Sequence, residues 1–141
     1  MRVVLDTRIL KLATLPPAVN PPALIVELAL AGRLGKWASP AVIEENAEVL
    51  REHEVFLRRV LQRLEICYPL TELEIIRHSP DNRFLECALA VEADYLVTVN
   101  TARGHFDRED YQGVRVARPG EFLSQPAVAT LVAAWTASPA Q

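Results

Sequence analysis

The chain has 141 residues, half of them hydrophobic and 23% charged, which is the composition of a folded domain and excludes an intrinsically disordered protein. Eighteen acidic side chains outnumber fifteen lysines and arginines, so the net charge of −3 excludes a strongly basic protein that would attract nucleic acid through bulk charge alone. The length fits one domain with a buried core.

The first residues do not resemble a signal peptide, because Asp6, Arg8 and Lys11 interrupt the apolar run. No uninterrupted apolar stretch approaches the ~20 residues that a membrane-spanning helix needs. Cys67 and Cys87 both lie inside apolar stretches, which is typical of small buried side chains rather than of a disulfide scaffold. We therefore expect a protein of the cytoplasm that does not bind membranes.

Apolar blocks along the chain alternate between the patterns of strands and helices. In the first half we expect a strand at 2–6, the proline-punctuated connection "LPPAVNPPA", a helix at 23–32, a strand at 36–39, helices at 41–52 and 54–64, and a strand at 65–70. In the second half we expect a helix at 81–93, strands at 94–99 and 114–117, a capped turn at 118–123 and a last helix within 125–140. Ser39-Pro40 and Ser79-Pro80 are typical helix starts. This alternation predicts an α/β fold with a parallel sheet covered on both faces.

Two polar residues follow expected strands at their carboxyl ends, where ligands gather in an open parallel α/β sheet. Asp6 ends the first strand, and Asn100 follows the strand at 94–99. Each also has a simpler interpretation. Asp6 can be a loop acid that binds its own backbone, and Asn100 can be a turn residue.

The helix expected at 41–52 places one glutamate near the core. Its apolar face carries five residues: Val42, Ile43, Ala47, Val49 and Leu50. Glu44 and Glu48 lie opposite that face, whereas Glu45 lies at its edge and can reach along the sheet. A glutamate at the rim of a helix without a function is the alternative.

Asp81 lies in the first turn of the helix expected at 81–93, on the face that carries Phe84 and Leu85 toward the core. It can simply complement the helix dipole, although most such acids face solvent. If Asp81 converges with Asp6, Glu45 and Asn100, the four side chains offer the oxygen ligands that Mg²⁺ or Mn²⁺ prefers. Such an ion can activate water for attack on a phosphate.

Cationic side chains flank Asp81 and Asn100 in an otherwise acidic protein. They are Arg77, His78, Arg83, Arg103, His105 and Arg108. Each alone is ordinary surface charge, but a cluster around a carboxylate pocket would suit a phosphodiester substrate.

Four stretches carry a resemblance to a known family: "VVLDT", "SPAVIEENAEVL", "SPDNRFLECALAVEADYLVTVN" and the following "HF". Through them the chain resembles PIN domains, in the branch of VapC-like toxins of toxin–antitoxin systems, from "RVVLDTRIL" to "RVARPGEFL". The resemblance implies a three-layer α/β/α PIN-like fold with a central, mainly parallel sheet. We expect that domain at 1–124, with a C-terminal helix and tail at 125–141.

The resemblance also implies a Mg²⁺- or Mn²⁺-dependent endoribonuclease that forms a homodimer and is neutralised by an antitoxin protein. The residues that match the family's metal-binding and catalytic positions are Asp6, Glu45, Asp81 and Asn100. The residues that we expect to contact the RNA substrate are Arg8, Arg83, Arg103 and His105.

The chain departs from the family pattern at three positions. Arg8 replaces the usual asparagine or serine, Val99 replaces a glycine, and Asn46 replaces a larger apolar residue. Arg8 and Val99 favour an alternative function, a degenerate PIN module that binds RNA or a partner without catalysis. Arg8 either turns toward the acidic cluster or faces outward to grip RNA. A haloacid-dehalogenase-like phosphatase needs an acid where Arg8 stands, which argues against that class.

Overall fold

The structure is a computed structural model in which residues 1–17 and 20–137 are described. In chain order the elements are β1 (Arg2–Leu5), α1 (Thr7–Ala13), α2 (Pro21–Leu30), β2 (Gly35–Ala38), α3 (Pro40–Val49), α4 (Glu54–Gln62), β3 (Leu64–Ile66), the 3₁₀ turn η1 (Ser79–Asp81), α5 (Asn82–Ala90), β4 (Tyr95–Val97), β5 (Asp110–Tyr111), β6 (Val114–Ala117), α6 (Pro119–Leu123) and α7 (Pro126–Thr136).

The strands form one six-stranded sheet in the order β3-β2-β1-β4-β6-β5. All neighbours are parallel except β5, which pairs antiparallel with β6. Strand β1 lies inside the sheet, and Val3, Val4 and Leu5 are fully buried because both faces of the sheet are covered. The carboxyl ends of β1 and β4 are therefore neighbours.

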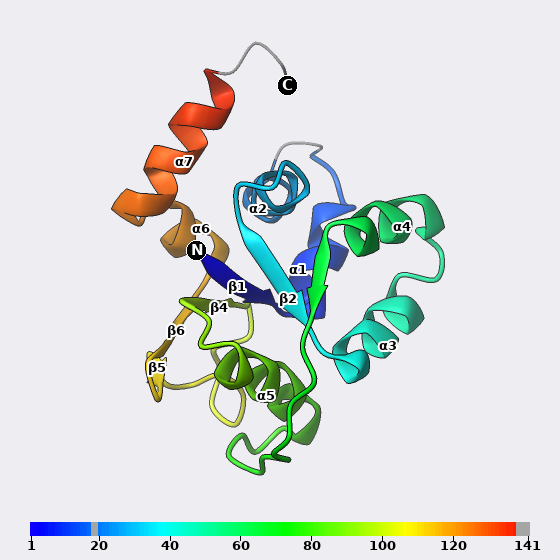
Figure 1. The fold of residues 1–141 in the computed structure, drawn as a ribbon, viewed down its shortest axis with the longest axis vertical. Coiled ribbons are helices and arrows are strands. Elements are labelled where there is room, and N and C mark those ends of the chain that lie inside the picture. The colour runs from blue at the N-terminus through cyan, green and yellow to red at the C-terminus, as the bar shows by residue number, and fades with distance from the viewer. Residues whose placement is uncertain (18–19, 138–141) are drawn as a thin grey trace.

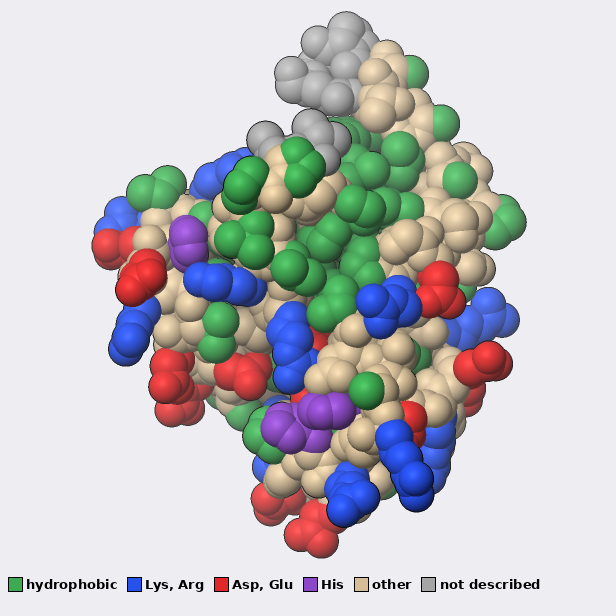
Figure 2. All heavy atoms as spheres, turned by 180° about the vertical axis from the view of Figure 1, so that it is seen from behind, with side chains coloured by type: hydrophobic (Ala, Val, Ile, Leu, Met, Phe, Trp, Pro, Cys, Tyr) green, Lys and Arg blue, Asp and Glu red, His purple; other side chains and the backbone are tan. Residues whose placement is uncertain are grey.

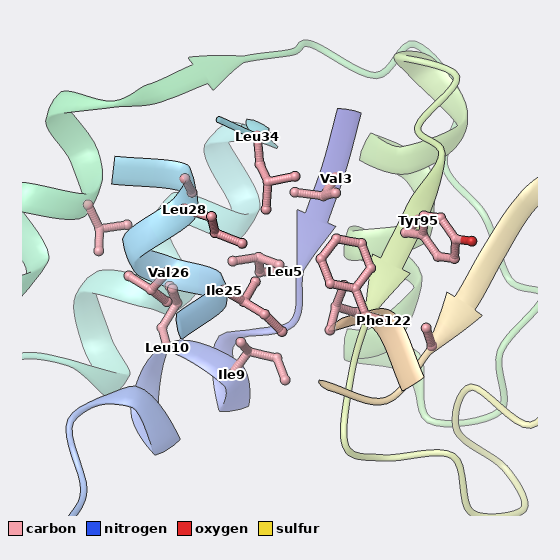
Figure 3. Close-up of a cluster of buried hydrophobic side chains, with 14 of the residues drawn as sticks. Val3, Leu5, Ile9, Leu10, Ile25, Val26, Leu28, Leu34, Tyr95 and Phe122 are labelled. Carbon is pink, nitrogen blue, oxygen red and sulfur yellow. The ribbon is translucent and has the colours of Figure 1, made fainter. Parts of the chain in front are cut away.

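Alternating residues of the central strands pack into two separate cores. Val4 and Leu96 face the core under α5, whereas Val3, Leu5 and Val97 face the core formed with α1, α2 and α6. Figure 1 shows α5 on one side of the sheet and α1 and α2 on the other, and Figure 3 shows the second core in detail. The three-layer α/β/α architecture with a mainly parallel sheet is confirmed.

Several predicted elements differ from those observed. The expected strand at 65–70 is only Leu64–Ile66, and the chain after it is irregular as far as η1. Ser79 is not the N-cap of α5, because a 3₁₀ turn precedes that helix. Helix α1 and strand β5 were not predicted. In α3 the buried residues are Val42 and Asn46, followed by Leu50 at the C-cap, so the expectation that Ala47 and Val49 face the core was wrong.

Helix α7 extends away from the sheet toward the C-terminus (Figure 1). Val128 is fully buried in the core with α6, and Leu131, Val132 and Trp135 pack against the same core with part of their surface exposed. The end of the predicted tail, 138–141, and part of the connection "LPPAVNPPA", 18–19, lie outside the described residues. Among the described helices, none has the length and apolar character needed to cross a membrane.

Candidate active site at the carboxyl end of the sheet

Asp6 lies where β1 passes into α1, and its side chain is almost fully buried. Its Oδ1 accepts a hydrogen bond from the backbone N–H of Arg8 at 3.2 Å, so Asp6 is the N-cap of α1. Its Oδ2 accepts a hydrogen bond from the Thr98 hydroxyl at 2.7 Å. Burial raises the pKa of Asp6, the two hydrogen bonds lower it in part, and the negative charge of Asp81 adds to the rise.

The loop after β4 brings Asn100 to the same place. Thr98, which is fully buried, donates its hydroxyl proton to Asp6 and accepts a hydrogen bond from the backbone N–H of Asn100 at 3.0 Å. The Asn100 amide satisfies its neighbours when its oxygen faces His105 Nδ1, at 2.8 Å, and Arg8 Nη1, also at 2.8 Å. Thr98 therefore couples the position of Asn100 to that of Asp6.

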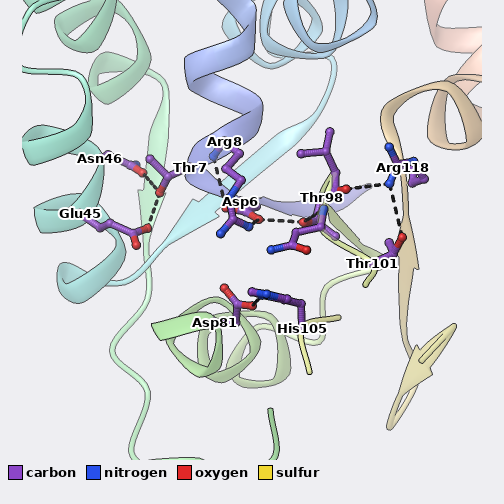
Figure 4. A network of polar contacts seen from close by, with 12 residues as sticks. Asp6, Thr7, Arg8, Glu45, Asn46, Asp81, Thr98, Thr101, His105 and Arg118 are labelled. Carbon is purple, nitrogen blue, oxygen red and sulfur yellow. Dashed lines mark hydrogen bonds and ion pairs between the residues drawn. The ribbon is translucent and has the colours of Figure 1, made fainter. Parts of the chain in front are cut away.

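Asp81 approaches from the opposite side, at the start of α5 (Figure 4). It is 3% exposed, and its Oδ2 lies 2.8 Å from His105 Nδ1. The ring of His78 lies against that of His105, with 4.6 Å between their centroids. His78, Asp81 and His105 each offer a ligand atom within 4.8 Å of the others. Two imidazole rings therefore lie next to the acidic residues and can supply nitrogen ligands.

Glu45 reaches the site from α3, where it is half-buried as its place at the edge of the apolar face predicted. Its Oε2 lies 2.5 Å from the hydroxyl oxygen of Thr7, the first residue of α1. The same hydroxyl lies 2.8 Å from Oδ1 of Asn46, which is fully buried. Thr7 has only one proton for two acceptors, and the amide nitrogen of Asn46 has no partner among the described residues.

The three carboxylates line one pocket of about 290 Å³. The residues around it are Asp6, Thr7, Arg8, Lys11, Glu45, Val49, His78, Asp81 and Phe84. Asn100 adjoins this pocket through its contacts with Arg8 and His105. The structure thus places three of the four nominated ligands around one pocket and Asn100 beside it. Among the described residues, the group whose ligand atoms lie within 4.8 Å of one another is His78, Asp81 and His105.

Arg8 turns inward. Its Nη1 lies 3.3 Å from Asp6 Oδ2, and both of its terminal nitrogens contact the Asn100 oxygen. The Arg8 side chain is still 42% exposed, whereas that of Asp6 is 4% exposed. Of the two orientations considered for Arg8, the structure has the one that points into the acidic cluster.

The expected cationic cluster divides into three parts. Arg77, His78, Arg103 and His105 line an open hollow next to Asp81. Figure 2 shows histidine side chains gathered on this face with arginine or lysine side chains around them. Arg108 lies over the ring of Tyr111 instead, 5.5 Å from its centroid.

Arg83 also lies elsewhere. Its guanidinium contacts Glu86 at 3.0 Å and Glu72 at 3.2 Å, and it donates to the backbone oxygen of Leu73. These contacts fasten the irregular segment after β3 to α5. The structure gives no support to the expectation that Arg83 contacts RNA, because its guanidinium is already bound by two carboxylates and does not line the site.

The donors present suit a hard divalent cation. Asp6, Glu45 and Asp81 supply carboxylate oxygens, and Asn100 supplies an amide oxygen, which is the ligand set that Mg²⁺ and Mn²⁺ take. Sequence reasoning did not identify Thr7 and Thr98, the two hydroxyls that orient these ligands. Their position in the sequence could have identified them, because each lies just after a buried strand and within two residues of a nominated ligand.

The loop that carries Asn100 is held from outside the pocket. Arg118 donates to the backbone oxygen of Val99 at 2.7 Å and lies 3.4 Å from the Thr101 hydroxyl. Val99 packs against the core with part of its surface exposed. The side chain that replaces the family's glycine is therefore accommodated without a positive φ at this position.

Comparison with known proteins agrees with this fold. No curated protein matches this chain. The fold resembles a crystal structure of VapBC2 from Rickettsia felis bound to a DNA fragment from their promoter, with a TM-score of 0.59 and 20% sequence identity over 84% of this chain and 98% of that chain. At this identity the likeness concerns the fold alone. The sequence profile of the PIN domain matches residues 2–102, which include all four nominated ligands, and the chain therefore belongs to the PIN domain family.

Proposed function

We propose that this protein is a metal-dependent endoribonuclease, the toxin of a toxin–antitoxin pair, that acts in the cytoplasm. The observation that carries the proposal is the convergence of Asp6, Glu45 and Asp81 on one pocket, with Asn100 beside them. Asp6 and Asp81 are almost fully buried. Buried carboxylates repel one another and are costly to desolvate, so a compensating cation would stabilise this arrangement.

One Mg²⁺ or Mn²⁺ ion would be held by Asp6, Glu45, Asp81 and Asn100. When bound, such an ion supplies a water of lowered pKa and stabilises charge on the phosphate under attack. The chain's own groups supply orientation. Thr98 fixes Asp6, and Thr7 fixes one oxygen of Glu45. The second oxygen of Glu45 has no protein partner among the described residues and can accept a proton from water.

The hollow beside Asp81 supports an RNA substrate. Arg77 and Arg103 line it together with His78 and His105, and neither arginine forms an ion pair among residues 1–17 and 20–137. Free guanidinium groups bind phosphate oxygens through two parallel hydrogen bonds. We assign the phosphates that flank the scissile bond to this hollow.

Two partners belong to the proposal. An antitoxin protein is supported by the likeness in fold to a chain of the VapBC2 complex. A homodimer is supported by α7, on which Leu131, Val132 and Trp135 keep part of their apolar surface exposed. Light scattering at micromolar concentration tests the dimer, and a strict monomer would contradict it.

The second candidate function is an RNA- or protein-binding PIN module without catalysis. The inward position of Arg8 favours it, because a guanidinium already contacts Asp6 and Asn100. Incubation of the purified protein with RNA in Mn²⁺ and in EDTA separates the two functions. Cleavage in Mn²⁺ that stops in EDTA supports the nuclease. RNA binding without cleavage in either buffer supports the binding module.

A further inference from the structure

Among the described residues, the Arg8 side chain makes its polar contacts with groups that are proposed metal ligands. Its side-chain partners are Asp6 Oδ2 and the Asn100 oxygen, at 3.3 and 2.8 Å from Nη1. We propose that Arg8 is a resident cation of the site and that it exchanges its carboxylate partner for an RNA phosphate, so that RNA and the divalent ion bind cooperatively. This inference rests on the proposed nuclease function and adds to it a mode of regulation.

The first step of the argument is competition for the same oxygens. Asp6 Oδ1 is already used by the backbone N–H of Arg8, and Asp6 Oδ2 is shared by Thr98 and the Arg8 guanidinium. A divalent ion needs an oxygen of Asp6 and the oxygen of Asn100 at short range. It also brings a positive charge next to that of Arg8. The ion and the inward guanidinium therefore exclude one another.

The second step is that Arg8 is able to leave. Its side chain is 42% exposed at the mouth of the pocket, so its outward rotation opens no cavity in the core. Its backbone N–H remains bound to Asp6 Oδ1 in either position, because that bond belongs to the start of α1. Rotation therefore breaks only the side-chain contacts with Asp6 and Asn100.

The third step is the destination of the guanidinium. A phosphodiester offers the planar pair of acceptors that an arginine fork matches best, and it lies in water rather than in a buried pocket. RNA bound in the hollow lined by Arg77 and Arg103 would bring phosphates close to the acidic residues, since His105 belongs to that hollow and contacts Asp81. The substrate thus supplies the partner that frees the metal ligands.

Thermodynamic linkage makes this exchange reciprocal. If RNA draws Arg8 out of the site and so tightens metal binding, the metal tightens RNA binding by the same factor. The protein without RNA would then hold its ion weakly. Its nuclease site would be complete only when substrate is present.

The test is a calorimetric Mn²⁺ titration with and without a short 2′-O-methyl oligoribonucleotide, which keeps the phosphodiester backbone but lacks the hydroxyl needed for adventitious hydrolysis. Three proteins are compared with the wild type. Arg8→Met keeps the stem without its charge, Arg8→Lys keeps the charge without the fork, and Arg51→Met removes an exposed arginine outside the pocket as the matched control. Circular dichroism verifies that each variant is folded.

For the wild type and Arg51→Met we expect weak Mn²⁺ binding that the oligonucleotide tightens on the order of ten-fold. Arg8→Met should bind Mn²⁺ on the order of ten-fold more tightly without the oligonucleotide and show no further gain with it. Arg8→Lys should keep the weak binding, because the charge is retained. Equal Mn²⁺ affinity of wild type and Arg8→Met would overturn the role of Arg8 and leave the proposed nuclease standing. No Mn²⁺ binding by any of the proteins would overturn both.

Discussion

The hydroxyl group of Thr98 donates a hydrogen bond of 2.7 Å to Oδ2 of Asp6, although the two residues lie 92 positions apart in the chain. The pairing of β1 with β4 makes this contact possible, since Leu5 is opposite Val97 and each strand then delivers its next residue to the same edge. The sheet itself therefore fixes the carboxylate that the proposed function needs most.

Replacement of Thr98 by valine should destabilise the protein by about 1–3 kcal/mol, because the buried carboxylate of Asp6 loses a donor and the valine offers none. Thr98→Ser is the matched control, since it keeps the hydroxyl, and it should lose less stability than Thr98→Val. Urea unfolding measures both. A valine variant as stable as the wild type would show that the bond contributes nothing.

Asp81→Asn should abolish RNA cleavage while the fold remains intact. The amide keeps an oxygen that accepts a hydrogen bond from His105 but removes one negative charge from the metal ligands. Lower repulsion among the remaining carboxylates can even raise stability. A cleavage assay together with circular dichroism measures the two effects, and undiminished cleavage would remove Asp81 from the site.

Arg83 and Arg103 should behave in opposite ways, although both were expected to contact RNA. Arg83→Gln should destabilise the fold, by about 1 kcal/mol or more, and leave RNA affinity unchanged, since its guanidinium is bound by Glu72 and Glu86. Arg103→Gln should weaken RNA binding in low salt and leave stability unchanged. Filter binding and urea unfolding on both variants test this contrast. Loss of RNA affinity in folded Arg83→Gln would contradict our assignment.

Lys36 gives the protein a pH-dependent stability. It is 3% exposed in β2, and burial lowers its pKa to about 8, from 10.5 in the unfolded chain. Between these two values the unfolded chain binds more protons, so the contribution of Lys36 to stability rises with pH from about 8 to 10.5. Below that window its buried charge costs on the order of 3 kcal/mol.

Lys36→Met should therefore stabilise the protein at pH 7 and lose most of that advantage at pH 10. Urea unfolding of both proteins at the two pH values measures the difference between their free energies of unfolding. Groups other than Lys36 titrate in both proteins, so their contributions cancel in this difference. An advantage of equal size at both pH values would show that Lys36 does not titrate in this window.

Much of the fold could be predicted from local signals. Buried strands were visible as short apolar runs, and Ser39-Pro40 marked the start of α3 because the serine caps the helix. Helix α1 was overlooked because Asp6 was interpreted as a ligand or as a loop acid, although a capping acid before Ile9 and Leu10 also predicts a helix. Strand β5 was overlooked because the turn after it places Gln112 at a positive φ. Glutamine is not one of the residues that predict such a turn.

The site could be predicted as a set of residues but not as an arrangement. Strand ends and the helical wheel nominated Asp6, Glu45, Asp81 and Asn100, because these rules concern single elements. The contact of Thr98 depends on which strands pair, and that of His105 depends on a loop that meets the start of α5 in space. No spacing in the sequence encodes such distances. The sequence does not encode the direction of Arg8 for the same reason.

The measurement that tests the central claim most directly is anomalous diffraction from a crystal soaked in Mn²⁺. The account predicts one manganese peak coordinated by Asp6, Asp81 and Asn100, with the Arg8 guanidinium rotated out of the pocket. A fully soaked crystal with no manganese at these residues and Arg8 still paired with Asp6 would contradict it.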